Sequence, residues 1–318
     1  MKTRKLGTNG PDLTVIGFGA WAIGGPWVYG WGPVDDRESI AAIHAALDAG
    51  INWIDTAAAY GFGHSETIVG RALKGMRGKA FVATKGGLVP DGKGDVYRNS
   101  RPESIRTEIE ESLLRLQTDH VDLYQIHWPD VGVPFEDSWE TMVRLREEGK
   151  ARFIGVSNYD VAALERCHAI SPAQSLQPPY SMLTREVESE ILPYCLKRGI
   201  GVLAYSPMQS GLLSGTFDKS RLAPDDWRHK FHWFQEPNLS AALEFVEDLR
   251  PMAAKYEATV GQLAIQWVLA DPAVTCAIVG ARRPRQIIET IRAADLLLSR
   301  EDLDYIRHLM KQRFDAKD

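Results

Sequence analysis

Short apolar runs alternate with longer amphipathic segments along almost the whole chain. Eight of these runs are four to seven residues long and mainly apolar, which is typical of parallel strands buried on both faces. The expected strands are Val15–Gly19, Asn52–Asp55, Ala80–Lys85, Val121–His127, Ala151–Ser157, Gln174–Gln177, Gly201–Ser206 and Val274–Val279.

The segments between these runs repeat apolar residues at helical spacing. Ile40, Ile43 and Leu47, for example, would share one face of a helix, and Pro102 stands just inside the start of another. The expected helices are Glu38–Ala49, Glu103–Leu116, Glu136–Glu148, Val161–Cys167, Glu188–Arg198, Val260–Ala270 and Pro284–Ala294.

This alternation predicts an α/β fold of the (β/α)8 TIM-barrel class, with residues 1–318 forming a single domain. A Rossmann fold is not supported, because no G-x-G-x-x-G motif opens a first βαβ unit. Three segments lie outside the repeat. We expect an N-terminal hairpin at Arg4–Leu13 that caps the barrel bottom, an insertion at Met208–Asn238 followed by a helix at Leu239–Tyr256, and a C-terminal helix at Arg300–Arg313.

Composition limits the kinds of partner. The chain has 318 residues, of which 44% are hydrophobic and 25% are charged, and its net charge is −5. These values are ordinary for a globular protein, and without a basic block neither nucleic acid nor a membrane is an expected partner. The start of the chain lacks the apolar core of a signal peptide, so we expect a cytoplasmic protein. The three cysteines, Cys167, Cys195 and Cys276, have no metal-site spacing and are expected to be small buried hydrophobes.

Ionisable residues stand at the ends of three successive expected strands. Asp55, Lys85 and His127 each end an apolar run, and Tyr60 follows Asp55 by five residues. Singly, each has an ordinary structural interpretation, such as a turn former, a loop charge, a core histidine or a packing tyrosine. Together they would converge at the carboxyl ends of neighbouring parallel strands, where α/β folds place their chemistry.

These four side chains suit proton transfer to a carbonyl oxygen. The unperturbed pKa of tyrosine is about 10, and a nearby ammonium such as that of Lys85 is expected to lower it. Asp55 would hold the lysine head in place, and His127 would donate a hydrogen bond that orients the substrate oxygen. The set therefore favours protonation of a carbonyl oxygen while a hydride reaches the carbon.

With these residues identified, the chain resembles the aldo-keto reductase superfamily over nearly its whole length, most closely the bacterial branch. The resemblance rests on I-D-T-A-x-x-Y-G at Ile54–Gly61, A-T-K at Ala83–Lys85, Y-x-I-H at Tyr124–His127, G-V-S-N at Gly155–Asn158, Y-S-P at Tyr205–Pro207 and G-A-R at Gly280–Arg282. It implies a catalytic tetrad of Asp55, Tyr60, Lys85 and His127, with Tyr60 as the general acid, and an NADPH (NADP+) cofactor.

The resemblance also implies the cofactor contacts. Ser157, Asn158 and Gln177 would bind the nicotinamide carboxamide, although the first two could instead cap the helix near Val161. Tyr205 would stack on the nicotinamide ring. The pyrophosphate would pass Ser206, Met208, Gly211 and Leu212, and the adenosine end would meet Gly280, Ala281, Arg282, Gln286 and Glu289.

Two departures from the family pattern affect the adenosine end. The first is that Gly280-Ala281 stands where Lys-Ser is common and Gln286 where Arg is common. A contact with the cofactor 2′-phosphate would then come from Arg282, with Arg283 or Arg285 as possible helpers. The second departure is Thr290, which stands where Asn is common, so the resemblance does not imply that residue's adenine contact here.

Aromatic residues near the expected strand ends are candidates for a substrate pocket. Trp21 and Trp128 are expected to line it. For Trp27, Tyr29 and Trp31 a pocket role and simple loop packing are equally compatible with the sequence. The sequence also leaves open which way the aromatic residues of the insertion face; these are Trp227, Trp233 and Phe234.

We therefore expect an NADPH-dependent oxidoreductase that reversibly reduces an aldehyde or ketone to an alcohol. One alternative is a non-catalytic NADPH-binding sensor or accessory subunit, similar to the potassium-channel β subunits. Another is a TIM-barrel hydrolase, but that chemistry needs two strand-end carboxylates about 5–9 Å apart, and Asp55 alone is an obvious one.

Overall fold

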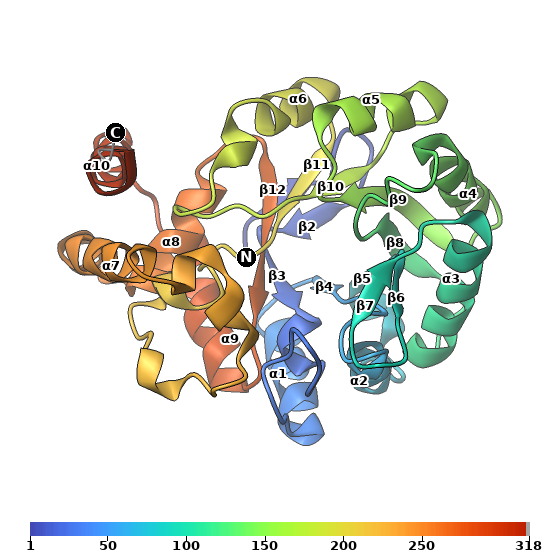
Figure 1. Ribbon diagram of the computed structural model, residues 1–318, viewed down its shortest axis with the longest axis horizontal. Coiled ribbons are helices and arrows are strands. Elements are labelled where there is room, and N and C mark those ends of the chain that lie inside the picture. Colours follow the sequence, from blue (N-terminus) through green and yellow to red (C-terminus); the bar gives the residue numbers. More distant parts are fainter. Residues whose placement is uncertain (316–318) are drawn as a thin grey trace.

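Eight parallel strands close into a barrel in the computed structural model, which describes residues 1–315. Strand β12 pairs with β3, which completes the ring that Figure 1 shows inside a layer of helices. The strands follow one another around the barrel as β3 (Ile16–Gly19), β4 (Trp53–Asp55), β5 (Phe81–Gly86), β8 (Val121–Ile126), β9 (Ala151–Ser157), β10 (Ser175–Gln177), β11 (Gly201–Ala204) and β12 (Val274–Gly280). The expected strands and the TIM-barrel fold are confirmed.

Helices follow the strands and cover the outside of the barrel (Figure 1). They are α1 (Asp36–Asp48), α2 (His64–Ala72), α3 (Pro102–Leu116), α4 (Phe135–Glu147), α5 (Val161–Ile170), α6 (Ile191–Arg198), α8 (Val260–Leu269) and α9 (Pro284–Thr290). The sequence analysis missed α2. This helix buries Ser65 and Glu66 beside Ile68 and Val69, so polar residues interrupt the apolar repeat that marks the other helices.

The barrel interior is filled below the strand ends by large apolar side chains, including Trp53, Leu123 and Leu203. The predicted N-terminal hairpin is present as β1 (Thr3–Lys5) and β2 (Asp12–Thr14), and its Leu6 and Leu13 join this interior cluster. The hairpin therefore plugs the lower end of the barrel and leaves the carboxyl ends of the strands open to carry a site.

Two further segments surround those carboxyl ends. A short hairpin of β6 (Leu88–Pro90) and β7 (Val96–Arg98) follows β5. It was not predicted, because its strands are only three residues long and flank a Gly- and Asp-rich turn. The insertion after β11 consists of short 3-10 turns, including η4 (Leu212–Ser214), η6 (Trp227–Lys230) and η7 (His232–Phe234), and leads into α7 (Asn238–Lys255).

The last helix, α10 (Arg300–Met310), packs beside α7 at the edge of the molecule (Figure 1). Cys167, Cys195 and Cys276 are buried, as expected. Within the part of the chain that the structure describes, no helix has the length and apolar character needed to cross a membrane.

Candidate active site

A buried ion pair lies at the carboxyl ends of β4 and β5. The Nζ atom of Lys85 is 2.8 Å from Oδ1 and 2.7 Å from Oδ2 of Asp55, and it also donates to the carbonyl oxygen of Thr56 at 2.9 Å. Gln177 donates from Nε2 to Oδ1 of Asp55 at 2.8 Å. Burial lowers the pKa of Lys85, whereas Asp55 and then Glu66 act to raise it. The lysine head is thus held by three oxygen atoms.

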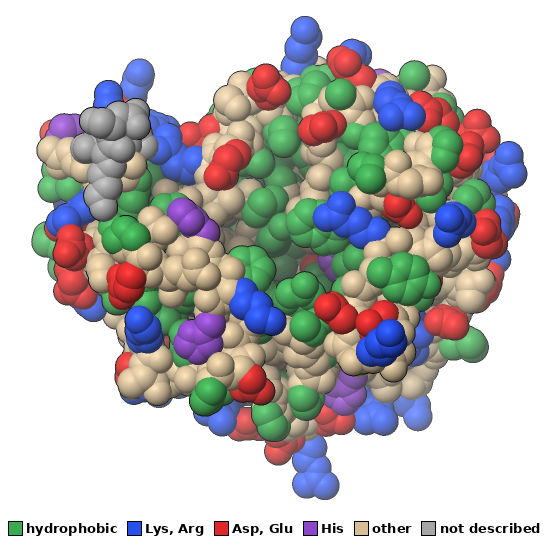
Figure 2. Space-filling model, in the orientation of Figure 1, with side chains coloured by type: hydrophobic (Ala, Val, Ile, Leu, Met, Phe, Trp, Pro, Cys, Tyr) green, Lys and Arg blue, Asp and Glu red, His purple; other side chains and the backbone are tan. Residues whose placement is uncertain are grey.

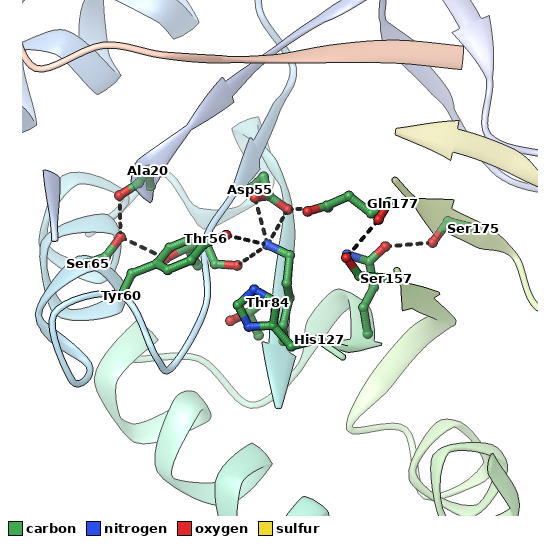
Figure 3. A network of polar contacts seen from close by, with 12 residues as sticks. Ala20, Asp55, Thr56, Tyr60, Ser65, Thr84, His127, Ser157, Ser175 and Gln177 are labelled. Carbon is green, nitrogen blue, oxygen red and sulfur yellow. Dashed lines mark hydrogen bonds and ion pairs between the residues drawn. The ribbon is translucent and has the colours of Figure 1, made fainter. Parts of the chain in front are cut away.

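Tyr60 completes this group from the turn that follows β4. Its hydroxyl lies 3.3 Å from Nζ of Lys85 (Figure 3). The next residue, Gly61, has a φ of +60°, and a Cβ there would come within 1.7 Å of the carbonyl oxygen of Gly24. Glycine is therefore required at position 61, and the turn that carries Tyr60 is packed directly against the first βα loop.

The environment of Tyr60 differs from the sequence-based prediction. Burial, the charge of Asp55 and the neighbouring Tyr205 raise the pKa of Tyr60 well above its ordinary value. The predicted lowering by Lys85 is wrong, because Asp55 neutralises the ammonium and burial penalises the phenolate. Tyr60 consequently keeps its proton at neutral pH.

His127 follows β8 directly and is only 8% exposed. Its ring meets the Tyr60 ring edge to face, with 5.6 Å between the centroids. Burial and then the charge of Lys85 hold the pKa of His127 well below its usual range, so the imidazole is neutral at neutral pH. A neutral imidazole beside a protonated phenol gives two hydrogen-bond donors in one place.

Beside Asp55, four side chains from β9, β10 and β11 form a connected polar patch. Ser157 donates to the carbonyl oxygen of Gln177 at 2.7 Å, and Asn158 donates from Nδ2 to Ser157 at 3.0 Å. The hydroxyl of Tyr205 donates to Oδ1 of Asn158 at 2.8 Å. The alternative capping role of Ser157 and Asn158 is wrong, because Asp160 caps α5 by accepting from the backbone of Ala163.

The chain turns sharply after β11, where the pyrophosphate residues were predicted. Ser206 has a φ of +56° and Gly211 a φ of +92°, so the backbone repeatedly enters the left-handed region. Open space surrounds the position of a Cβ on Gly211, which means that conformation rather than crowding favours glycine there. Leu212 is buried beneath this turn and Met208 is half-buried beside it.

The predicted adenosine residues lie at the end of β12 and on α9. Gly280 ends the strand, Ala281 is buried, and Glu289 is exposed on the helix. Gln286 orders the intervening turn, since its Oε1 accepts from the backbone N–H of Arg282 at 2.9 Å and of Arg283 at 3.1 Å.

Arginine side chains gather around this turn. Arg283 pairs with Glu38 at 3.0 Å, whereas Arg282 donates to the carbonyl oxygen of Trp31 at 3.1 Å and has no carboxylate partner within residues 1–315. Burial, followed by the charges of Arg283 and Arg228, lowers the pKa of Arg282. Such a cluster of like charges is suited to an anion.

This geometry agrees with comparisons to known proteins. The aldo/keto reductase family model matches residues 15–311. The chain belongs to the aldo-keto reductase family.

Among its relatives, aldo-keto reductase YhdN of Bacillus subtilis is 40% identical, with 98% of this chain and 94% of that protein covered. An NADH-specific methylglyoxal reductase of Escherichia coli is 37% identical over 97% of this chain and 98% of its own length. The solved glycerol dehydrogenase AKR11B4 of Gluconobacter oxydans has a TM-score of 0.89 at 38% identity, covering 99% of this chain and 97% of that one. The reductase described here is therefore an NAD(P)H-dependent oxidoreductase.

Aromatic side chains surround the mouth of the reductase barrel. Figure 2 shows a hollow at the centre of this face with hydrophobic side chains around it. Trp21 contacts Trp31 and Trp227, with centroid distances of 5.7 and 5.2 Å. Trp27, whose role the sequence left open, lies 6.2 Å from the ring of Tyr60.

The opposite side of the mouth carries a contact that the sequence analysis missed. Arg98 of β7 stacks over the ring of Trp128, with 5.0 Å between its guanidinium carbon and the ring centroid. From the insertion, Trp227 is 6% exposed and packs on Trp21, whereas Trp233 packs on Phe314. Within residues 1–315, Trp227 rather than Trp233 thus makes the ring contact with the first βα loop.

Proposed function

We propose that the protein reduces an aldehyde or ketone to an alcohol with NADPH, with Tyr60 as the general acid. The observation that carries this proposal is the half-buried Tyr60 hydroxyl 3.3 Å from a lysine that is paired with Asp55. When bound, a nicotinamide cofactor would supply the hydride for the carbonyl carbon. Tyr60 donates its proton to the carbonyl oxygen, and a neutral His127 donates a hydrogen bond that orients that oxygen.

Lys85 and Asp55 act through Tyr60 in this proposal. Once Tyr60 has given up its proton, the phenolate oxygen faces the Lys85 ammonium, and this attraction favours the charged oxygen at the moment of transfer. Asp55 keeps the ammonium in place and offsets the cost of burying it. The pair therefore stabilises the transient phenolate without ionising Tyr60 at rest.

The residues of the polar patch fit a nicotinamide carboxamide. They combine hydroxyl, amide N–H and amide carbonyl groups whose mutual hydrogen bonds fix them in advance, which suits a group with both donors and acceptors. We assign Ser157, Asn158 and Gln177 to the carboxamide and Tyr205 to stacking on the ring. The remaining cofactor residues in this proposal are Ser206, Met208, Gly211, Leu212, Gly280, Ala281, Arg282, Gln286 and Glu289, and the pocket residues are Trp21 and Trp128.

The preference for NADPH over NADH rests on Arg282. Its guanidinium lacks a carboxylate partner within residues 1–315, whereas the neighbouring Arg283 and Arg228, whose charges act to lower its pKa, pair with Glu38 and Asp226. A 2′-phosphate would give Arg282 the anionic partner that it lacks, and arginine recognises phosphate oxygens through its planar fork. Because the Escherichia coli relative is named as NADH-specific, the two cofactors have to be compared directly.

The deciding experiment follows the loss of reduced-cofactor absorbance with a panel of carbonyl compounds, with NADPH and NADH in parallel. Methylglyoxal is the first substrate of the panel, since one relative is named for it. We expect turnover that is faster at low NADPH than at equal NADH. Cofactor binding without turnover on any aldehyde would instead support a sensor or accessory subunit.

We also propose that residues 1–318 work as a single domain. The N-terminal hairpin fills the barrel bottom, and α10 packs on α7, which in turn contacts α8 of the barrel wall.

A further inference from the structure

Two carboxylates are buried behind the strand that carries Lys85. Glu66 of α2 is fully buried and accepts from the hydroxyl of Thr84 at 2.5 Å and from Nε of Arg115 at 2.7 Å. Glu108 of α3 is 8% exposed and accepts from the backbone N–H of Gly87 at 2.9 Å and from the hydroxyl of Ser104 at 3.0 Å. The contacted residues Thr84 and Gly87 stand on either side of Lys85.

The backbone after Lys85 needs such support because it consists of two glycines. Gly86 cannot carry a side chain, since a Cβ there would lie 2.1 Å from the hydroxyl of Tyr124 and 3.4 Å from Oε2 of Glu108. Gly87 has a φ of +89°. Glycine has more conformational freedom than any other residue, so this segment depends on hydrogen bonds from its neighbours. The carbonyl oxygens of Gly86 and Gly87 accept from the backbone N–H of His127 at 2.9 Å and of Asn99 at 3.2 Å, and the Gly87 N–H is held by Glu108.

We propose that Glu108 is a positioning residue for Lys85. Its carboxylate fixes the Gly86-Gly87 segment through the Gly87 N–H, and this keeps the lysine ammonium within reach of both Asp55 and Tyr60. Glu66 holds the residue before Lys85, Thr84, by accepting from its side-chain hydroxyl. This inference rests on the proposed reductase function of the tetrad.

The charge of the Glu108 carboxyl changes near neutral pH. Burial raises the pKa of Glu108 to about 7, against the opposing effects of its hydrogen bonds from Gly87 and Ser104. The ionisable groups around it are Glu111 and Arg115 on its own helix, Tyr124 from β8 and Glu66 from α2. An ionised carboxylate accepts a stronger hydrogen bond than a protonated one, so the hold on Gly87 tightens as pH rises through about 7.

The kinetic test compares kcat against pH for the wild type, Glu108→Gln and Ser104→Ala. Glutamine keeps an acceptor for the Gly87 N–H but cannot ionise. Ser104→Ala removes the hydrogen bond from the Ser104 hydroxyl to Glu108 and leaves the Gly87 contact in place. We expect wild-type kcat to rise about fivefold as pH increases through the titration of Glu108. This rise in kcat with pH should be absent in Glu108→Gln and present in Ser104→Ala. The KM for NADPH should not change. A step that persists in Glu108→Gln would overturn the proposal.

A second measurement does not depend on turnover. Hydrogen exchange at the Gly87 amide should be faster in Glu108→Ala than in the wild type and unchanged in Ser104→Ala. If Glu108→Ala does not fold, wild-type protection of Gly87, corrected for intrinsic exchange, must still increase as Glu108 ionises. Protection that does not depend on Glu108 refutes the inference, whereas a wild type with the expected exchange and no carbonyl turnover refutes the proposed function alone.

Discussion

The tetrad and the adenosine end of the proposed cofactor site are built on different principles. Asp55, Lys85 and His127 lie at strand ends inside a closed barrel, and each is at least 92% buried. Arg282, Gln286 and Glu289 lie on a turn and a short helix at the rim, where Arg282 is half-buried and the other two are exposed. Rigid strands thus fix the groups that would perform proton transfer, while cofactor recognition depends on a rim that sequence change can alter easily.

The electrostatics of the two regions differ in the same way. At the tetrad, the Lys85 charge is balanced by Asp55, and both Tyr60 and His127 are neutral at neutral pH. At the rim, Arg228 pairs with Asp226 at 2.7 Å and Arg283 pairs with Glu38 at 3.0 Å, whereas Arg282 has no carboxylate partner within residues 1–315. The charges of the tetrad balance one another, whereas Arg282 at the rim is suited to a ligand that brings negative charge.

The largest effect on catalysis is expected for Tyr60→Phe, which tests the tetrad. This variant removes the proton that the reaction needs and keeps the ring that packs on His127 and Trp27. We expect kcat to fall about 10²–10⁴-fold, the usual contribution of general acid catalysis, while the Kd for NADPH stays within about twofold. Single-turnover kinetics and fluorescence titration measure the two quantities. A variant that keeps more than about a tenth of wild-type kcat would exclude Tyr60 as the general acid.

The Asp55–Lys85 pair is expected to behave as one unit. Lys85→Met and Asp55→Asn should each lower kcat severely, because either change leaves the partner buried without its counter-charge. The double variant should be little worse than Lys85→Met, since residues that act together show non-additive losses. Measurement of kcat for the three variants gives the coupling, and losses that simply multiply would show that the two residues act independently.

The sequence predicted the tetrad far better than the adenosine end at the rim. Asp55, Lys85 and His127 could be placed because strand-end positions in successive βα units converge in any TIM barrel. The raised pKa of Tyr60 could not be predicted, since it depends on how Asp55 and burial offset the Lys85 charge in three dimensions. The approach of Arg228 to Arg282 could not be predicted either, because it brings together segments more than fifty residues apart through an insertion without regular periodicity.

Missed elements have a similar cause. Helix α2 buries Glu66, and this buried charge has no apolar periodicity to reveal it, although it contacts the strand of the predicted Lys85. The β6–β7 hairpin was missed because three-residue strands give too little alternation, and with it the contact of Arg98 on Trp128. The single-domain organisation and the roles of the individual site residues stay predictions.

At the rim, Arg282→Ala should separate the two cofactors. A charge-assisted contact to phosphate contributes about 1.5–3 kcal/mol, so we expect the Kd for NADPH to rise about 10- to 150-fold and the Kd for NADH to stay nearly constant. Arg283→Ala is the matched control, because Arg283 already pairs with Glu38 and should change the ratio of the two constants little. Equal losses for NADPH and NADH in Arg282→Ala would show that this residue does not recognise the 2′-phosphate. A wild-type preference for NADH would contradict the cofactor assignment itself.

The smallest expected effect distinguishes fold support from cofactor binding at neighbouring residues. Asp160 caps α5 and is exposed, whereas Asn158, two residues earlier, belongs to the polar patch. Loss of an N-cap typically costs about 0.5–2 kcal/mol, so Asp160→Ala should lower the free energy of unfolding by about that amount and leave the Kd for NADPH unchanged. Asn158→Ala should instead raise the Kd for NADPH, because it removes the partner of the Tyr205 hydroxyl and the proposed carboxamide contact. Denaturant unfolding and fluorescence titration on both variants make the comparison, and a cofactor defect confined to Asp160→Ala would show that the cap, not the patch, shapes the nicotinamide site.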